Sequence, residues 1–263
     1  MTNTDQAWEF YGQEDPYYGV LSDDKYLKSR LDESTLNSFF ALGQDYIDAT
    51  LTTVREHVDA DPATGRALDF GCGVGRLTFP LAKVFEAVVG VDISTSMLDE
   101  ARRNADRLAC HNVEFLLGDV TFSHLTGGFD LVHSFIVFQH IRADRGERIV
   151  QQLIDRLNEG GIGILHFTYA DATTTPLIRR AATKAYERLP FVYGIRNVLK
   201  RQPFRRPPMQ MNLYDLSRIF LILQESGCHD VHARFTDASH YNHPIHGVVL
   251  YFKKERRDTT THH

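Results

Sequence analysis

The most regular pattern of apolar residues lies in residues 34–58, where they recur every three to four positions. This spacing places them on one face and predicts a single long amphipathic helix. Asp61 and Pro62 should end it, because proline cannot continue a helix. Residues 1–33 are rich in Asp, Tyr and Gly and lack this period, so we expect an irregular leader there with one short helix.

From residue 67 onward, short apolar runs alternate with amphipathic stretches. The runs predict strands and the stretches between them predict helices, an order typical of a parallel sheet covered by helices on both faces. The expected strands are 67–70, 87–92, 113–117, part of 129–138 and 162–167, and the expected helices are 77–85, 96–109 and 144–158.

Residues 171–212 interrupt this alternation with five prolines and are expected to form an insertion with helices of its own. A helix over 213–226 follows, with Asn212 as its N-cap candidate. Strands over 231–236 and 248–252 come next, joined by a turn-rich loop with no helix. Such a pair must be antiparallel, because a parallel crossover needs a dozen or more residues. The pattern therefore predicts an α/β fold with a mostly parallel sheet and an antiparallel last strand.

Composition narrows the class of protein. The 263 residues are 43% apolar and 24% charged, enough for a sizeable core, and we expect a single domain over residues 1–263. The net charge of −5 gives no general reason to expect nucleic-acid binding, and no apolar run approaches the length of a membrane span. Three widely spaced cysteines and an acidic, aromatic N-terminus predict a cytoplasmic protein without a disulfide framework or a signal peptide.

Candidate chemistry begins in the turn after the first strand, at Gly71, Gly73 and Gly75. Glycines there let the backbone approach a ligand, although a tight turn without a ligand uses the same residues. Asp92 ends the second strand, where a carboxylate can accept hydrogen bonds from both hydroxyls of a ribose. Asp119 follows the third strand in the same way. Together these strand ends predict a pocket for a nucleoside that bears a cationic group.

The spacing also separates two classes of nucleotide-binding protein. Arg76 occupies the position of the third glycine in the dinucleotide fingerprint, which argues against NAD. The chain instead resembles the class I S-adenosylmethionine-dependent methyltransferases in three segments. LDFGCGVG looks like their cofactor turn, VGVDIS like their ribose-binding strand end, and LLGDV like their adenine-contacting loop. The resemblance covers roughly 36–170 and 213–254 and implies a Rossmann-like, seven-stranded sheet.

By this resemblance the protein is an enzyme that takes a methyl group from S-adenosylmethionine and releases S-adenosylhomocysteine. Asp69 would orient the methionine ammonium and Asp92 would hold the ribose. Asp119 and the Val120 amide would read the polar edge of the adenine. The other residues implied to bind the cofactor are Gly71, Gly73, Gly75, Ile93, Met97, Ser134 and Phe135.

Residues 1–60 resemble the N-terminal cap of small-molecule methyltransferases. Tyr18 is expected to close over the cofactor and Trp8 to contact the acceptor, whereas Phe39 is expected to pack in the core. An aromatic cap would exclude water from a sulfonium electrophile. His140 is the candidate base, because relatives often place a histidine there and its ordinary pKa suits proton transfer near neutrality. A structural hydrogen-bonding role for His140 is the alternative.

The insertion at 171–212 is expected to form a helical lid where the acceptor enters. Residues 172–212 carry nine basic residues and one acid, Glu187, within a chain of negative net charge. Such a lid would concentrate an anionic acceptor, including one on a phosphopantetheine carrier, although an ordinary solvated helix face has the same composition. The candidate acceptor contacts are Arg201, Arg205, Arg206 and, in the loop near the C-terminus, Tyr241.

The residues leave two other functions open, an NAD(P)-dependent Rossmann oxidoreductase or epimerase and a cofactor-binding protein without catalysis. A metal site is not expected, because the spacing of His240, His243 and His246 around a proline is no standard ligand arrangement. The expected acceptor is a small molecule methylated on oxygen or nitrogen, with no nucleic acid and no stable membrane insertion.

Overall fold

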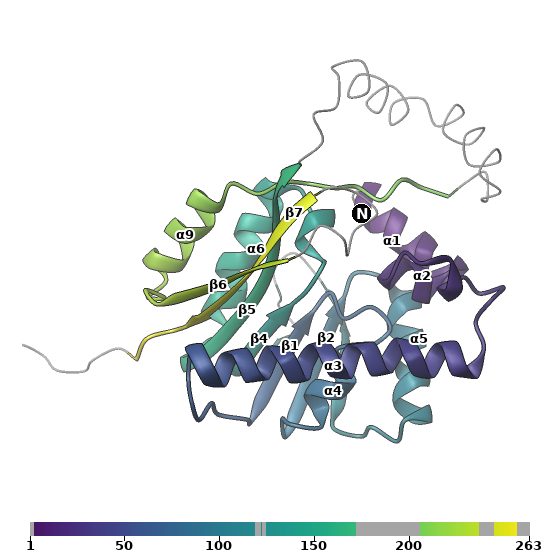
Figure 1. Ribbon diagram of the computed structural model, residues 1–263, viewed down its shortest axis with the longest axis horizontal. Helices are drawn as coiled ribbons and strands as arrows, with labels where there is room; N and C mark the ends of the chain where they lie inside the picture. Colours follow the sequence, from purple (N-terminus) through teal and green to yellow (C-terminus); the bar gives the residue numbers. More distant parts are fainter. Residues whose placement is uncertain (1–2, 119–121, 123–124, 172–205, 237–244, 257–263) are drawn as a thin grey trace, which may run out of the picture.

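The computed structural model describes residues 3–118, 122, 125–171, 206–236 and 245–256. They form a seven-stranded sheet in the order β3-β2-β1-β4-β5-β7-β6, in which β7 runs antiparallel to both of its neighbours and the other adjacent pairs are parallel (Figure 1). The predicted α/β architecture is therefore confirmed. The strands are β1 Arg66–Phe70, β2 Ala87–Asp92, β3 Val113–Leu117, β4 Phe129–Ser134, β5 Leu157–Asp171, β6 Val231–Thr236 and β7 Ile245–Lys253.

Two layers of helices cover the sheet, and alternate strand residues face each layer. Leu68 and Val132 pack with α6 (Ala143–Asp155) and α9 (Leu216–Glu225) on one face. Ala67 and Leu131 pack with α3 (Glu33–His57) and α4 (Thr78–Ala82) on the other. Both faces of the central strands are buried, which explains why these strands are continuous apolar runs.

The first thirty residues differ from the expected irregular leader. They contain α1 (Asn3–Glu14), α2 (Pro16–Val20) and a 3₁₀ turn, η1 (Asp24–Tyr26). Proline at the first position of α2 suits a helix start, since that residue needs no amide hydrogen. The prediction of one short helix was wrong because these helices gain their stability by packing. Their aromatic residues cluster with the buried Phe39 of α3, and this core position for Phe39 was predicted.

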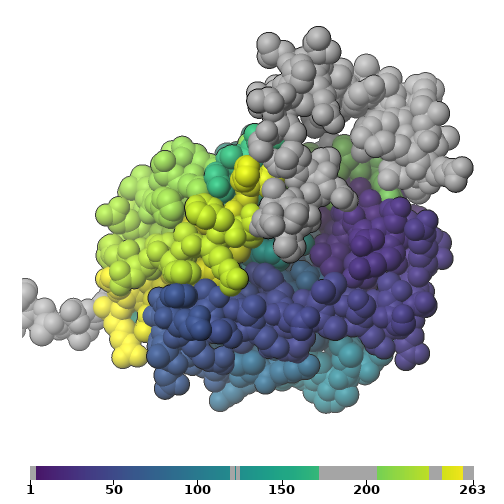
Figure 2. Space-filling model, in the orientation of Figure 1, coloured from purple at the N-terminus to yellow at the C-terminus, as the bar shows by residue number. Residues whose placement is uncertain are grey.

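The N-terminal cap, as we call residues 3–31, lies against α3 and against α5 (Thr95–Arg107). In the space-filling view the cap and α3 form one continuous surface (Figure 2). Gly12 permits the close approach to α5, because a Cβ there would lie 2.5 Å from the Ser94 hydroxyl oxygen.

Several element ends differ from the prediction. β4 stops at Ser134, and Ile136 then takes a positive φ of 56°, which no extended strand can accommodate. α9 begins after Asp215, whose carboxylate accepts the Ser217 amide, so Asn212 is not the N-cap. The helix expected over 144–158 ends at Asp155, since β5 already begins at Leu157.

Residues 206–214, the strap, run from the cap to the carboxyl end of β5. The Tyr11 hydroxyl donates to the Pro207 carbonyl at 2.7 Å, and the Asn212 amide donates to the Gln139 carbonyl at 2.7 Å. The Tyr214 amide donates to the Thr168 carbonyl at 2.8 Å. The strap therefore joins the N-terminal helices to the turn that follows β4. Most of the predicted lid at 171–212 lies outside the described residues.

Candidate active site

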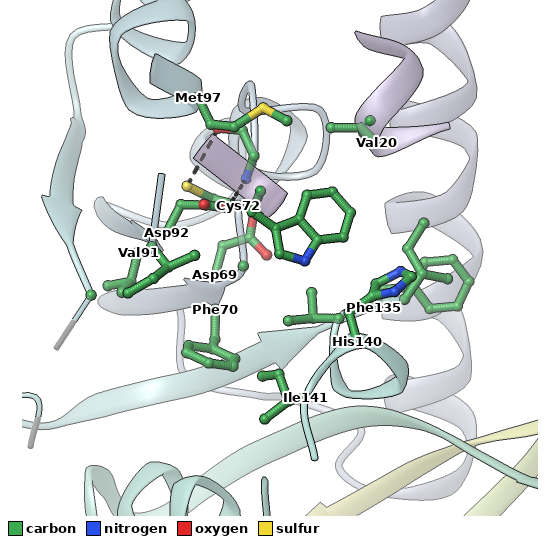
Figure 3. A pocket seen from close by; sticks show the side chains of 18 of the residues that line it. Val20, Asp69, Phe70, Cys72, Val91, Asp92, Met97, Phe135, His140 and Ile141 are labelled. Carbon is green, nitrogen blue, oxygen red and sulfur yellow. Dashed lines mark hydrogen bonds between the residues drawn. The ribbon is translucent and has the colours of Figure 1, made fainter. Parts of the chain in front are cut away.

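A pocket opens at the carboxyl edge of β1, β2 and β4, beneath the cap (Figure 3). Asp92, Cys72 and Met97 stand together at one end of the view, Phe135 and His140 at the other, and Asp69 between them. The lining residues are Thr4, Asp5, Trp8, Gly19, Val20, Asp69, Phe70, Gly71, Cys72, Gly73, Arg76, Leu77, Val91, Asp92, Ile93, Met97, Gly118, Phe135, Ile136, Val137, His140, Ile141, Arg145 and Ile149.

The glycine turn forms the floor of this pocket, and it needs glycine for two reasons, backbone conformation and space. Gly71 and Gly73 have φ values of +75° and +54°, a region that other residues rarely adopt. A Cβ at Gly71 would also lie 2.3 Å from the Val137 side chain, and one at Gly73 would lie 2.8 Å from that of Val20. The floor is thus bare backbone, which a ligand can approach closely.

Asp92 closes the end of the pocket at β2. Its two carboxylate oxygens accept the amides of Gly73 and Ser94, each at 2.9 Å, so it ties the glycine turn to the start of α5. The Asp92 carboxyl is partly removed from water, and this burial raises its pKa to about 6, although the hydrogen bonds from the two amides act to lower it. Hydroxyl donors from a ligand would favour the charged form, so Asp92 is suited to accept them.

Asp69 lies under the middle of the pocket and is 2% exposed. One carboxylate oxygen contacts His133 Nδ1 at 2.9 Å and the other accepts the Thr78 hydroxyl at 2.7 Å. His133 itself is fully buried in β4, as expected for a sheet residue. These partners fix the Asp69 carboxylate against the floor and keep its negative charge below the glycine turn.

His140 stands at the opposite end, in the 3₁₀ turn Phe138–His140. Its Nδ1 contacts the Gln210 carbonyl at 2.7 Å and its Nε2 contacts the Gln139 amide nitrogen at 3.1 Å. Because a carbonyl can only accept, Nδ1 carries the hydrogen and Nε2 holds the lone pair. Burial lowers the pKa of His140 to about 4, so the ring is neutral at physiological pH.

Comparison with known proteins places this geometry in a family. Residues 67–161 match the family model described as a methyltransferase domain. An uncharacterized methyltransferase of Oceanobacillus iheyensis is 25% identical over 182 residues, which is 63% of this chain and 84% of that protein. The family match covers the part of the chain that holds the glycine turn, Asp92 and His140, and it identifies that part as a methyltransferase domain.

Solved structures share the fold of this chain at low identity. The magnesium protoporphyrin IX methyltransferase of Synechocystis PCC 6803 with bound S-adenosylmethionine has a TM-score of 0.61 at 18% identity, covering 97% of this chain and 99% of that one. A phosphoethanolamine N-methyltransferase of Haemonchus contortus, in complex with phosphomonomethylethanolamine, has a TM-score of 0.55 at 16% identity, covering 80% and 53%. A 23S rRNA (uracil-C5) methyltransferase of Histophilus somni is 39% identical over 56 residues, only 13% of its length.

Polar contacts hold the N-terminal cap against α5. The Glu9 carboxylate accepts the hydroxyls of Ser94 and Ser96 at 2.9 and 2.6 Å, at the N-terminus of α5. Hydrogen bonds from the two serines outweigh burial and lower the pKa of Glu9. Trp8, the residue before Glu9 in α1, lines the pocket, and its ring packs edge-on against the His140 ring with 4.8 Å between the ring centroids. The cap therefore supplies part of the site rather than only covering it.

The arginine expected to contact an anionic acceptor is placed elsewhere. Arg206 is 5% exposed and pairs with Asp15, and its guanidinium lies over the Tyr18 ring at 4.6 Å. Its charge is therefore balanced within the protein, and neither Arg206 nor Tyr18 is among the lining residues. This arrangement fastens the strap to the cap.

Most of the other predicted residues gather in the pocket. Asp69, Gly71, Gly73, Asp92, Ile93, Met97, Phe135, Trp8 and His140 line it. Gly75 lies just beyond, and the Ser134 hydroxyl points back to donate to the Phe70 carbonyl at 2.9 Å, which joins β4 to β1. Asp119, Val120, Arg201, Arg205, Tyr241, His240 and His243 lie outside the described residues.

Sequence reasoning missed lining residues that come from distant segments, namely Thr4, Asp5, Val20 and Arg145. No local pattern marks them, because they reach the pocket only through packing of the cap and α6. In the described ranges, no group of three metal-ligating side chains comes together, and none of the helices combines the length and apolar character needed to span a membrane.

Proposed function

We propose that this protein is an S-adenosylmethionine-dependent methyltransferase, which transfers the methyl group to an oxygen or nitrogen of an anionic small molecule. The observation that supports the proposal is one continuous pocket, which has Asp92 and Met97 at one end and Phe135 and His140 at the other. A cofactor and an acceptor can therefore bind next to each other in this pocket.

The residues present fit S-adenosylmethionine. The bare glycine floor admits a ligand that a Cβ would displace, and the half-buried Asp92 carboxylate can accept two ribose hydroxyls. Met97, 1% exposed, and Ile93 would flank the adenine. When bound, the cofactor supplies an electrophilic methyl group on a sulfonium. The chain supplies position and a dry site, which suffice for a direct displacement.

His140 and Gln139 are suited to receive a proton from the acceptor. His140 Nε2 faces the Gln139 side-chain amide nitrogen, while Gln139 Oε1 is buried without a hydrogen-bond partner in the described part of the chain. If Nε2 takes up a proton, rotation of the Gln139 amide would turn Oε1 toward it as an acceptor. The Gln210 carbonyl meanwhile holds Nδ1. His140 would thus act as the base and Gln139 would stabilise its charged form.

Support for an anionic acceptor comes from charge and from relatives. The segment 172–212 carries nine basic residues and one acid, and a structural neighbour is solved with phosphomonomethylethanolamine. Arg206 no longer adds to this argument, because Asp15 balances its charge. The remaining candidates, Arg201 and Arg205, would raise the local concentration of an anion by steering.

The test uses acceptors in matched pairs that differ in one ionised group, such as phosphoethanolamine against ethanolamine, with methyl-labelled S-adenosylmethionine. We expect methylation of the ionised member, with kcat/KM reduced several-fold by added salt and by Arg201→Gln combined with Arg205→Gln. The control changes Arg103 and Arg218, two exposed arginines on α5 and α9, to Gln. Equal methylation of neutral and ionised acceptors, unaffected by salt, would reject the anionic class and leave the methyltransferase activity standing.

A further inference from the structure

The strap holds the turn that carries His140. The Gln210 carbonyl accepts a hydrogen bond from His140 Nδ1 at 2.7 Å, and the Tyr214 hydroxyl donates to the Ile141 carbonyl at 2.9 Å. Residues 206–214 are described throughout and form neither helix nor strand. No regular backbone pattern therefore fixes the Gln210 carbonyl, and its position depends on contacts with neighbouring segments.

The first helix supplies such a contact. The Thr4 hydroxyl of α1 donates to Gln210 Oε1 at 2.8 Å, across 206 positions of the sequence. Trp8 lies one turn further along the same face of α1 and packs against the His140 ring. α1 thus reaches His140 in two ways, directly through the Trp8 ring and indirectly through Gln210.

The position of one hydrogen decides whether His140 can act as a base. A neutral imidazole has one N–H group and one lone pair, and the partner of one nitrogen fixes the role of the other. The Gln210 carbonyl can only accept, so it selects the form with the hydrogen on Nδ1. In the other form Nε2 carries the hydrogen and can no longer take a proton from an acceptor.

We propose that Thr4 and Gln210 are positioning residues for His140: the docked cap fixes the Gln210 side chain, and the Gln210 carbonyl then keeps the hydrogen on Nδ1. This role deepens the proposed function and rests on its base. It makes a docked cap the condition for a competent base, because displacement of α1 removes the Thr4 contact from the strap. Closure of the pocket and preparation of the base are then a single event.

The test measures the tautomer of His140 by nitrogen NMR, in protein with isotope-labelled histidine and without ligand at pH 7.5. His140→Asn assigns the resonances by their loss. In the wild type we expect the form with hydrogen on Nδ1 to predominate. Thr4→Val keeps the shape of the side chain and removes the donor, so it should lower the ratio of the Nδ1–H form to the Nε2–H form by about 3- to 10-fold, the usual effect of one hydrogen bond.

A second variant tests whether Thr4 acts through Gln210. Gln210→Met removes the acceptor oxygen of the same contact and should lower the ratio by a similar factor. The two changes combined should have no larger effect than either alone, because they break one shared hydrogen bond. Thr4→Ser keeps the hydroxyl and should restore the ratio of the wild type.

A matched control separates the positioning of His140 from the fastening of the cap. Tyr11→Phe removes another hydrogen bond between cap and strap, the one to the Pro207 carbonyl, and should leave the tautomer ratio near that of the wild type. Trp8 is the only tryptophan of the chain, so its fluorescence emission reports the docking of α1. That emission should be unchanged in Thr4→Val.

Three results would overturn the positioning role. One is a wild-type ring without a preference for hydrogen on Nδ1, and another is an unchanged ratio in Thr4→Val. The third is a change in Tyr11→Phe as large as that in Thr4→Val, which would leave only general support by the cap. Failure of the proposed base is a separate result, unchanged turnover in His140→Ala, and it is distinguishable because the NMR ratios are measured without ligand or turnover.

Discussion

Replacing Asp92 by Asn should separate cofactor binding from the stability of the fold. The carboxylate now accepts the amides of Gly73 and Ser94 and is the expected acceptor for the ribose hydroxyls. Asn keeps the size of the side chain and one acceptor oxygen, but it lacks the charge. Asp92→Ala would in addition leave both amides without their partner, so Asn is the sharper variant.

The size of each effect can be worked from the structure. Burial raises the pKa of Asp92 from 3.8 to about 6, so the folded protein favours the protonated carboxyl. That stabilisation is present below pH 3.8 and is lost as the pH rises through 6. The shift corresponds to roughly 3 kcal/mol at most, and we expect about 1–2 kcal/mol because the group is only half-buried. Asn resembles the protonated form but has one acceptor oxygen for the two amides, so Asp92→Asn should cost no more than about 1–3 kcal/mol of stability at pH 7.5.

The affinity for the cofactor should fall more strongly than the stability of the fold. Loss of a charged acceptor costs about 1.5–3 kcal/mol, or roughly 10- to 150-fold in Kd for S-adenosylmethionine. Calorimetry at pH 7.5 gives the affinity, and urea unfolding at pH 7.5 and 4.5 gives the stability. Asp99→Asn, an exposed change on α5, is the control and should alter neither by more than about 0.5 kcal/mol. Undiminished affinity in Asp92→Asn, or a large loss of stability at pH 7.5, would refute the reasoning.

Three further predictions concern groups around the same pocket. If the His140 ring is the base, His140→Ala should lower kcat by ~10²–10⁴ and leave the cofactor affinity near that of the wild type. Because burial holds the pKa of His140 at about 4, kcat/KM of the wild type should not fall between pH 8 and pH 6. His166 is fully buried in β5, and burial lowers its pKa to about 3. His140 and His166 should therefore each cost roughly 2 kcal/mol of stability as the pH falls from above 6.5 to 5, and His166→Asn should recover its share in urea unfolding. Glu9→Gln should make α1 more sensitive to limited proteolysis without lowering the unfolding temperature of the sheet, and equal protection in variant and wild type would contradict the fastening role of Glu9.

The parts of the site that could be predicted are those that a local pattern defines. Asp69, the glycines and Asp92 fall within one strand-turn-helix-strand unit, so their order along the chain fixes their place at one sheet edge. The long helix α3 and the strand order follow from apolar periods in the same way.

The rest depends on contacts between distant segments. Arg206 looked like an acceptor contact because of the charge of its segment, yet its partner Asp15 lies 191 positions earlier. The helices of the cap are short and are stabilised by packing, for example by the Tyr17 hydroxyl, which bonds to Glu100 at 2.6 Å. No single-segment pattern can reveal such partners, because the pairing exists only after the chain has folded.

The sequence separation of the cap contacts also determines the order in which these contacts can form during synthesis. Contacts of Glu9 and Tyr17 with α5 span 83–87 positions, so they become possible once residues near 100 have emerged. Contacts of Thr4, Tyr11 and Asp15 with the strap span 191–206 positions. At about 5–20 residues per second, the ribosome delivers the strap roughly 5–20 s after α5.

If the cap docks on α5 as soon as those contacts are possible, the strap-facing sides of Tyr11 and Tyr18 are uncovered during that interval. We therefore expect the nascent chain to pass through a stage in which the cap contacts α5 but not yet the strap. Slowing translation downstream of α5 should lengthen that stage and increase misassociation, whereas the completed strap ends it by closing the first helices onto the last part of the chain.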